Sequence, residues 1–550
     1  MRRPTLAAAL LLLSITVTRA QTIAPITERI EVIVTNVDVT VTDRAGRPVS
    51  GLTRDDFEIF EDGRPQKITN FYTIENASVR IHRADKGAME DAGDLQQFRR
   101  KVVLMIDNNF IEKPQRDAAL NQLDEFIDKN FGGNYEWSVI TVGRRVQTVQ
   151  TFTTDKQQIH AALDQVRLTG TVNFQAEQDR ALLSDGTRRA TMADAASNYG
   201  YQSSVRFRGR EQTMRNLLAT TNTARAVIQT CRAFAAAEGK KLVVLVTAGM
   251  ERKTSFDAYD LGTRDRKLED MKLDVGRALD EMVHEANAAN FNLYVVKARG
   301  RGMVAPQHDV ENKSSGLNVQ STNIFQQGGG AGPIDTSDVD SSSLTLALGT
   351  GGLYLTSSNT GRNFEKIDTD TSNYYSLGYS PQRPEDSEYH HISVKVKRPG
   401  LVARHREGYV TVSFEERLEE SLLSPLAFPK EKGSLPVTLD LGKPTDTDRV
   451  MVPMTAEMPL SRLTMLPRED GYIGRVHVYL SIYDADGNNV GYHHLIRDVN
   501  VAAADQARIK NGFFRYKMNV ALKKGEFTFL VTLRDDVSNE IGTATQNARL

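Results

Sequence analysis

The stretch VVLMIDNNF, from Val102 to Phe110, decides the fold of the long central part of this chain. Its unbroken apolar run ends at Asp107, and a helical pattern of apolar residues follows. Such a run is typical of a strand that is buried on both faces of a parallel sheet. Ligands of open α/β sheets bind beyond the carboxyl ends of the strands, where Asp107 and Asn109 stand. The stretch therefore predicts an α/β sheet and raises the question of whether Asp107 holds a metal ion.

The same alternation of strand and helix continues through residues 99–414. The segments KLVVLVTAG (241–249) and FNLYVVKA (291–298) are further apolar runs, and amphipathic helical patterns separate the runs. This order predicts a doubly wound, mostly parallel sheet. Two polar segments interrupt it, at residues 175–212 and 299–340, and the glycine- and serine-rich second one is interpreted as a flexible loop.

Regions with the strand period flank the α/β domain. Residues 21–83 alternate apolar and polar side chains and predict a small N-terminal β-domain. Residues 84–98 are polar and charged and are interpreted as a linker. Residues 415–550 show strong alternation, turn signals and no helical pattern, which predicts a C-terminal β-sandwich.

The N-terminus has the three-part layout of a secretory signal. Arg2 and Arg3 precede an apolar core from Leu6 to Val17, and small residues lead to Ala20. The core is shorter than the ~20 residues that a membrane span needs. We expect cleavage after residue 20 and a periplasmic or secreted protein without a transmembrane segment; an uncleaved N-terminal anchor is the alternative.

Composition limits the classes of partner. The chain has 550 residues, 25% of them charged, and a formal net charge of -1. Nucleic-acid binding usually leaves a basic excess, so no nucleic-acid partner is expected. Cys231 is the single cysteine, which excludes an intramolecular disulfide, and its helical surroundings indicate buried packing.

Histidines and catalytic motifs give no indication of an enzyme. His390–His391 and His493–His494 are adjacent pairs, and neighbours in a strand point to opposite faces. We interpret both pairs as surface or strand residues. The sequence has no His-Glu-x-x-His motif, nucleophile elbow or phosphate loop. Neither a catalytic residue nor a cofactor is therefore expected.

Two sequence motifs carry a resemblance to a known family. Residues 41–68 read VTDRAGRPVSGLTRDDFEIFEDGRPQKI, and residues 373–410 contain NYYSLGYSP and VKVKRPGLVARHREGYV. With the α/β pattern between them, they resemble the von Willebrand factor type A-related family of exported bacterial proteins. The resemblance covers about residues 33–414.

The resemblance implies a ligand face at the strand ends. In type A domains this face carries a metal-ion-dependent adhesion site, built on Asp-x-Ser-x-Ser with a threonine and a second aspartate from other loops. Asp107 matches the first aspartate and Thr171 the loop threonine, whereas Asn109 and Ile111 replace the serines and Ala248 stands at the second aspartate. Divalent Mg²⁺ prefers a nearly complete shell of oxygen ligands. The resemblance therefore implies a degenerate site without a tightly bound metal.

The expected function is that of an exported, non-catalytic adhesion-type module that binds an unidentified protein at the cell envelope. Asp107, Asn109 and Thr171 mark its expected ligand-binding face. Two alternatives stay open. One is an envelope hydrolase whose residues converge from several strand ends. The other is a weak Mg²⁺ site in which water completes the shell around the same three residues.

Overall fold

The computed structural model describes most of the chain from residue 34 onward. Within 34–550 it describes all residues except 76–77, 83–88, 92–98, 131–134, 172–197, 238, 249, 251–265, 299–337, 358, 382–387, 425–432, 446–449 and 486. The predicted signal peptide and nearly all of the predicted loop at 299–340 therefore lie outside the described residues. Of the helices in the described ranges, none is long and apolar enough to cross a membrane.

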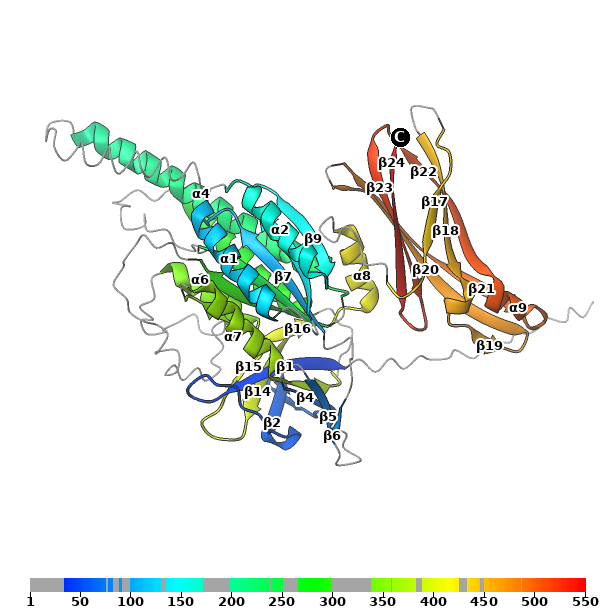
Figure 1. Cartoon of the computed structure of the whole chain (residues 1–550), viewed down its shortest axis with the longest axis horizontal. Coiled ribbons are helices and arrows are strands. Elements are labelled where there is room, and N and C mark those ends of the chain that lie inside the picture. The colour runs from blue at the N-terminus through cyan, green and yellow to red at the C-terminus, as the bar shows by residue number, and fades with distance from the viewer. Residues whose placement is uncertain are drawn as a thin grey trace, which may run out of the picture.

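A six-stranded sheet forms the centre of the molecule (Figure 1). Its order is β12 (Tyr354–Leu355), β11 (Phe291–Lys297), β10 (Lys240–Thr247), β7 (Arg100–Asp107), β8 (Tyr135–Val142) and β9 (Val146–Thr153). All neighbouring pairs are parallel except β8 and β9. The predicted α/β domain with a mostly parallel sheet is confirmed.

Helices cover both faces of this sheet, which explains the unbroken apolar runs. Val103 and Met105 of β7 pack in the same core as α4 (Asn198–Ala233) and α5 (Arg266–Ala288). Leu104 and Ile106 point the other way. They share the second core with α1 (Lys113–Asn130), α2 (Lys156–Leu168) and α7 (Thr360–Ser372). The apolar residues from Val102 to Ile106 thus alternate between the two cores, so that this run of β7 has no solvent-facing position that would favour a polar residue.

Two helices of the α/β domain begin inside segments that were predicted to interrupt it. The segment 175–212 is not wholly an irregular insertion, since α4 begins at Asn198; α6 (Asp338–Gly349) likewise begins inside the predicted loop. Cys231 lies fully buried on α4, as expected, and burial raises the pKa of its thiol.

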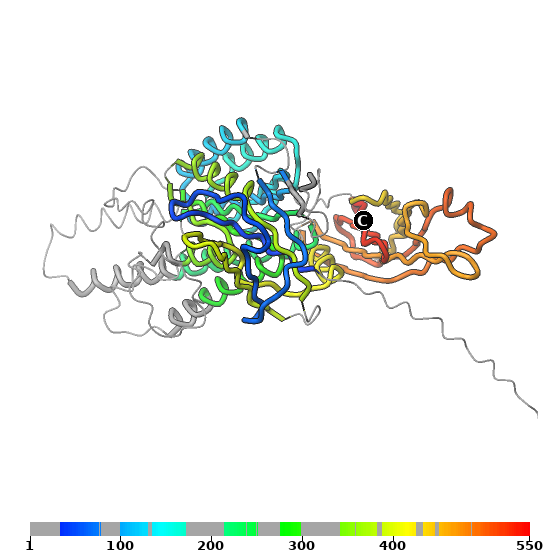
Figure 2. Tube along the Cα trace, turned by 90° about the horizontal axis from the view of Figure 1, so that it is seen from below, coloured from blue at the N-terminus to red at the C-terminus, as the bar shows by residue number. Residues whose placement is uncertain are grey.

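The structure divides the N-terminal part differently from the predicted boundaries. β13 (Tyr374–Tyr379) lies between β1 (Thr35–Thr42) and β4 (Asn70–Glu75) and pairs with both. β14 (Tyr389–Val396) pairs with β2 (Phe57–Glu61). Figure 2 shows these yellow-green strands beside the blue N-terminal ones. Residues 374–410 therefore belong with the N-terminal strands, and the α/β domain is inserted into a split β-domain.

Shorter strands complete the split β-domain. They are β3 (Arg64–Gln66), β5 (Ser78–His82), β6 (Met89–Asp91), β15 (Val402–Arg404) and β16 (Gly408–Val410). The predicted linker at 84–98 contains β6, which pairs with β5. Polarity alone does not distinguish a linker from an edge strand, because edge strands are often polar.

A salt bridge ties the two halves of the split domain together. Thr53 and Asp56 form a capping box around a short 3-10 helix, η1 (Arg54–Asp56). Asp56 also accepts two 2.8 Å hydrogen bonds from the Arg398 guanidinium, which lowers the pKa of that carboxyl to about 2. The rings of Phe57, Phe71 and Tyr375 pack together behind this pair. The two motifs of the resemblance thus fold as one unit.

Truncation tests this division of the chain. A fragment that ends at Ser372 lacks β13–β16, and we expect β1 to lose its fold because its partners β13 and β15 are gone. Hydrogen exchange should show fast β1 amides and protected β7 amides in this fragment. A control fragment that ends at Val412 keeps these strands and should protect β1. Equal β1 protection in both fragments would contradict the split domain.

The C-terminal part is built from two facing antiparallel sheets. One contains β17 (Thr438–Leu441), β18 (Val450–Pro459) and β22 (Phe513–Leu522). The other contains β19 (Leu466–Arg468), β20 (Gly471–Asp484), β21 (Asn489–Ala502), β23 (Glu526–Asp535) and β24 (Ile541–Arg549). Inward residues such as Met454 of β18 and Val478 of β20 share one core, as expected for a sandwich.

Helices occur in this part although the sequence pattern predicted none. They are α8 (Phe414–Leu423) and the short α9 (Ala507–Asn511). α8 lies between the α/β domain and the sandwich (Figure 1). Its Ser421 hydroxyl donates to the Ala233 carbonyl at the end of α4, and its Leu418 and Leu422 pack with Tyr479 of the sandwich. α8 thus contacts both parts of the chain.

Candidate functional site at the strand ends

The sheet changes direction at β7, which places Asp107 at the usual position of a ligand site. From β7 the chain continues to β8 on one side and later returns to β10 on the other. Asp107 ends β7 and Thr247 ends the adjacent β10. Ligands of open α/β sheets bind at such a switch point. The prediction that Asp107 stands at the carboxyl edge of the sheet is therefore confirmed.

The Asp107 carboxylate is fully buried and bonded to the protein itself. Its Oδ1 accepts hydrogen bonds from the backbone N–H of Asn109 at 3.1 Å and from the Thr223 hydroxyl at 3.2 Å. Its Oδ2 accepts a 2.9 Å hydrogen bond from the Thr247 hydroxyl. The Asn109 side-chain amide donates to the Thr223 hydroxyl at 3.2 Å. Four residues from β7, its loop, α4 and β10 thus form one closed polar cluster.

Burial dominates the electrostatics of this cluster. It raises the pKa of Asp107 to about 6, although the hydrogen bonds from Thr247, Asn109 and Thr223 act to lower it. These donors stabilise the charged form but do not outweigh the loss of hydration. The carboxyl group therefore sits in the protein at a cost in stability when it is charged.

A buried arginine connects the neighbouring loops. Arg116 of α1 is fully buried and donates from Nη1 to Asn108 Oδ1 at 3.0 Å and to Thr169 Oγ1 at 3.4 Å. Its Nη2 donates to the Arg167 carbonyl at 3.2 Å, and it forms a 3.1 Å ion pair with Asp117. A guanidinium thus joins the loop after β7 to the end of α2.

The structure brings together two of the three residues predicted for the face. Asp107 and Asn109 share the polar cluster, whereas their hydrogen bonds within the described ranges do not include Thr171. Thr171 lies half-buried three residues beyond α2, and Thr169 is the threonine of that loop that contacts Arg116. The helix ends at Leu168, and Thr169 directly follows its last turn. The assignment of Thr171 to the ligand-binding face stays a prediction.

Sequence reasoning missed three other members of the cluster and its surroundings. Thr247 directly precedes Ala248 at the end of a predicted strand, so its position was a usable signal. Arg116 lies in the predicted helix after β7, and the sequence pattern did not single it out. Thr223 lies on a helix more than a hundred residues from Asp107, and no local pattern connects the two.

The histidine pairs are split between surface and interior. His391 and His493 are exposed, as neighbours in a strand require, but their partners are not surface residues. His390 is buried with its Nδ1 2.8 Å from Asp62 Oδ2. His494 lies beside His477 of the adjacent strand. All four histidines lie in strands, as the sequence predicted, but His390 and His494 also contact other titratable side chains.

Comparison with known proteins gives no family assignment. No protein-family model and no curated protein matches the chain. Among solved structures, the conserved hypothetical protein BatB from Bacteroides thetaiotaomicron is 11% identical with a TM-score of 0.25, covering 50% of this chain and 97% of that one. An aerotolerance-related membrane protein from Bacteroides fragilis is 12% identical with a TM-score of 0.25, covering 49% and 98%. The PilB minor pilin from Streptococcus sanguinis is 8% identical with a TM-score of 0.24, covering 61% and 87%. Likenesses this partial establish neither the family nor the function of this chain.

Proposed function

We propose that this protein is an exported, non-catalytic binding module with a type A-like α/β domain. It binds a protein partner at the carboxyl edge of its sheet, without a tightly bound metal ion. Its split β-domain and sandwich flank that domain. The proposal rests on the state of Asp107 and on the residues at the same edge.

The main support for this proposal is that both oxygens of the Asp107 carboxylate already accept hydrogen bonds from the protein. Mg²⁺ needs oxygen atoms directed at it and usually keeps several waters. Here the hydroxyls of Thr223 and Thr247 donate toward Asp107, and the carboxylate is out of contact with solvent. The same burial keeps Asp107 away from any substrate, which favours a binding role over the hydrolase alternative.

Basic side chains at this edge indicate the charge that a partner should carry. Arg144 and Arg145 are exposed in the turn directly after β8, which ends at the same edge as β7. An exposed guanidinium pairs readily with a carboxylate of another protein. We therefore expect an acidic segment of the partner to dock here through direct ion pairs rather than through a shared metal.

Site-specific photo-crosslinking tests this face. A photo-crosslinking residue in place of Arg145 keeps Arg144 available, and the same residue in place of Lys129 is the matched control. Lys129 is exposed near the end of α1, which runs back toward the opposite edge of the sheet. We expect envelope extract to give a discrete adduct from position 145 and none from position 129. Arg144→Glu in the first variant should reduce its yield severalfold.

A chelator separates the proposal from its alternative. The adduct should form equally with and without EDTA, because no metal completes the contact. An adduct that EDTA abolishes would support the weak Mg²⁺ site. Equal adducts at positions 145 and 129 would contradict binding at this edge.

A further inference from the structure

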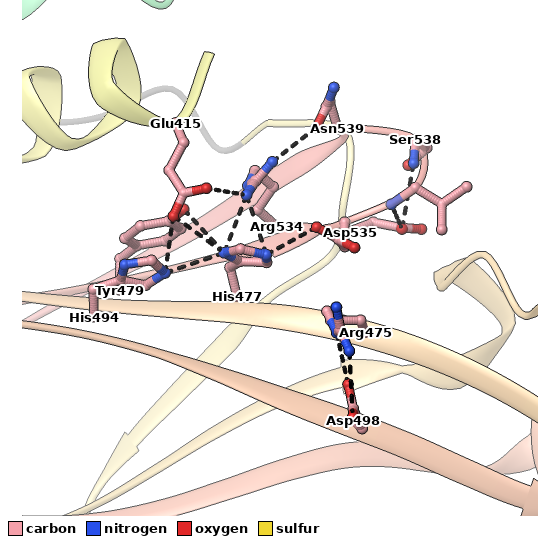
Figure 3. Close-up of polar contacts among 12 residues, drawn as sticks. Glu415, Arg475, His477, Tyr479, His494, Asp498, Arg534, Asp535, Ser538 and Asn539 are labelled. Carbon is pink, nitrogen blue, oxygen red and sulfur yellow. Dashed lines mark hydrogen bonds and ion pairs between the residues drawn. The ribbon is translucent and has the colours of Figure 1, made fainter. Parts of the chain in front are cut away.

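A cluster of histidines and carboxylates lies where α8 meets the sandwich (Figure 3). His477 Nδ1 on β20 and His494 Nε2 on β21 are 3.1 Å apart. Glu415 Oε1, from the first turn of α8, is 3.6 Å from each of these nitrogens. The antiparallel register places His494 opposite Tyr479, so that His477 is its diagonal neighbour on the same face of the sheet. Three ligand-type atoms thus converge from two strands and one helix.

The outer nitrogens of both histidines face carboxylates. His477 Nε2 is 3.0 Å from Asp536 Oδ1, and His494 Nδ1 is 3.0 Å from Glu419 Oε1. In neutral imidazoles these contacts place the N–H on the outer nitrogen and the lone pair on the inner one. Metal-bound histidines typically donate their second N–H to a carboxylate in this manner. The two inner lone pairs then face each other, an arrangement that a cation between them would stabilise.

Arg534 does not occupy the direction in which the His477 lone pair points. Its Nη2 is 3.0 Å from Nδ1 and 3.2 Å from Nε2 of His477. An atom on the lone-pair axis of Nδ1 would lie much farther from Nε2, so near-equal distances place Arg534 over the face of the ring. The same Nη2 donates to Glu415 Oε2 at 3.1 Å. Arg534 thus holds the second carboxylate oxygen and leaves Oε1 directed at the histidines.

We propose that His477 Nδ1, His494 Nε2 and Glu415 Oε1 bind a divalent transition-metal ion of the zinc class. A triangle with sides of 3.1, 3.6 and 3.6 Å has its centre about 2.0 Å from each corner. Zinc lies about 2.0–2.2 Å from histidine nitrogens and carboxylate oxygens, so the ion fits near this centre with a water as fourth ligand. The carboxylates of Glu415, Glu419 and Asp536 surround this position, and the guanidinium of Arg534 lies beside it.

The ion would fasten the connecting helix to the sandwich. Glu415 belongs to α8, whereas both histidines belong to the sheet formed by β20 and β21. α8 also bonds to the end of α4 through Ser421. Metal binding at this point therefore fixes the sandwich against the helix that leads out of the split β-domain. This inference is independent of the proposed function at the strand ends.

Zinc titration of the full chain tests the site. After removal of metal with a chelator, calorimetry and competition with a zinc indicator near pH 7.5 should show one saturable site per chain. We expect His494→Gln and Glu415→Gln each to weaken binding at least tenfold, and Asp536→Asn to weaken it about tenfold through its hydrogen bond to His477. His493→Gln is the matched control, since that neighbour is exposed, and its affinity should be unchanged.

Further readouts separate lost binding from lost folding. Circular dichroism of each metal-free variant should match that of the metal-free wild type. Zn²⁺ should raise the melting temperatures of the wild type and of His493→Gln equally, and those of His494→Gln and Glu415→Gln much less. Affinity should fall below about pH 6, because protonated histidines do not bind metal. No saturable site in the folded wild type, or undiminished affinity in both His494→Gln and Glu415→Gln, would overturn the proposal.

Discussion

Replacing Asp107 with asparagine is expected to raise the free energy of unfolding by up to about 3 kcal/mol above pH 7. Burial raises the pKa of this carboxyl to about 6 in the folded protein, from an ordinary value of 3.8. At a pH between these two pKa values, the carboxyl group is mostly protonated in the folded state and mostly ionised in the unfolded state. Wild-type stability from this group is therefore fully present below about pH 4 and is lost as the pH rises to about 6.

Asparagine removes this loss because it is neutral at every pH. Its oxygen can still accept hydrogen bonds from Asn109 and Thr223, and the Thr247 hydroxyl can rotate to accept from its amide. The cluster thus keeps its shape in the variant. The sign of the effect would be opposite if Asp107 bound a structural metal, because asparagine would then weaken a stabilising contact.

Denaturant unfolding of both proteins between about pH 4.5 and pH 8 measures the effect. The difference in unfolding free energy should grow with pH up to about 6 and then level off, with or without Mg²⁺. Asp164→Asn is the control, since that carboxylate is 75% exposed, and its difference from wild type should stay small at all pH values. A difference for Asp107→Asn that does not change with pH would contradict the raised pKa of the buried carboxyl group.

Local sequence patterns were sufficient to predict the α/β core. β7, β10 and β11 are apolar on both faces, and only strands between two helical layers tolerate this composition. The pairing of β13 and β14 with the N-terminal strands was not predictable in the same way. Partners such as Val37 and Leu377 are more than three hundred residues apart, and nothing in either segment identifies the other.

The candidate sites show the same limit. Asp107 and Asn109 were found because they directly follow a strand, whereas Thr223 approaches them from a distant helix. His494 was judged by its neighbour His493 alone, yet its environment depends on the register of β20 and β21, which brings His477 to it. Register is set by the whole hairpin and its packing, so a single strand does not reveal which side chains meet across it.

Replacing Lys241 with methionine is expected to stabilise the protein by up to about 4 kcal/mol near pH 6. Lys241 lies in β10 with 5% of its surface exposed, and its ammonium donates a 2.7 Å hydrogen bond to the Ala235 carbonyl. Burial lowers the pKa of this group to about 7, and the nearby cations Arg417, Arg406 and Lys101 add to the effect. The charged form is therefore held in the core at a cost.

The pH dependence of this effect has a defined direction. The unfolded lysine titrates near its ordinary value of 10.5, so between about pH 7 and pH 10.5 the unfolded state binds more protons than the folded one. Wild-type stability from this group is lowest below pH 7 and recovers as the pH rises. Methionine fills similar space, carries no charge and gives up only one hydrogen bond, about 1 kcal/mol.

Thermal and denaturant unfolding between about pH 6 and pH 9.5 checks this expectation against a neighbouring lysine. The advantage of Lys241→Met should shrink steadily as the pH rises, because the wild-type lysine is increasingly neutral in the folded state. Lys240→Met should instead lower stability, since Lys240 forms a 3.2 Å ion pair with Asp38 and lies over the ring of Tyr374. Two adjacent lysines of one strand should thus respond with opposite signs, because within the described part of the chain only Lys240 of the two forms an ion pair with a carboxylate. A destabilised Lys241→Met variant across the whole range would show that the hydrogen bond to Ala235 outweighs the burial of the charge.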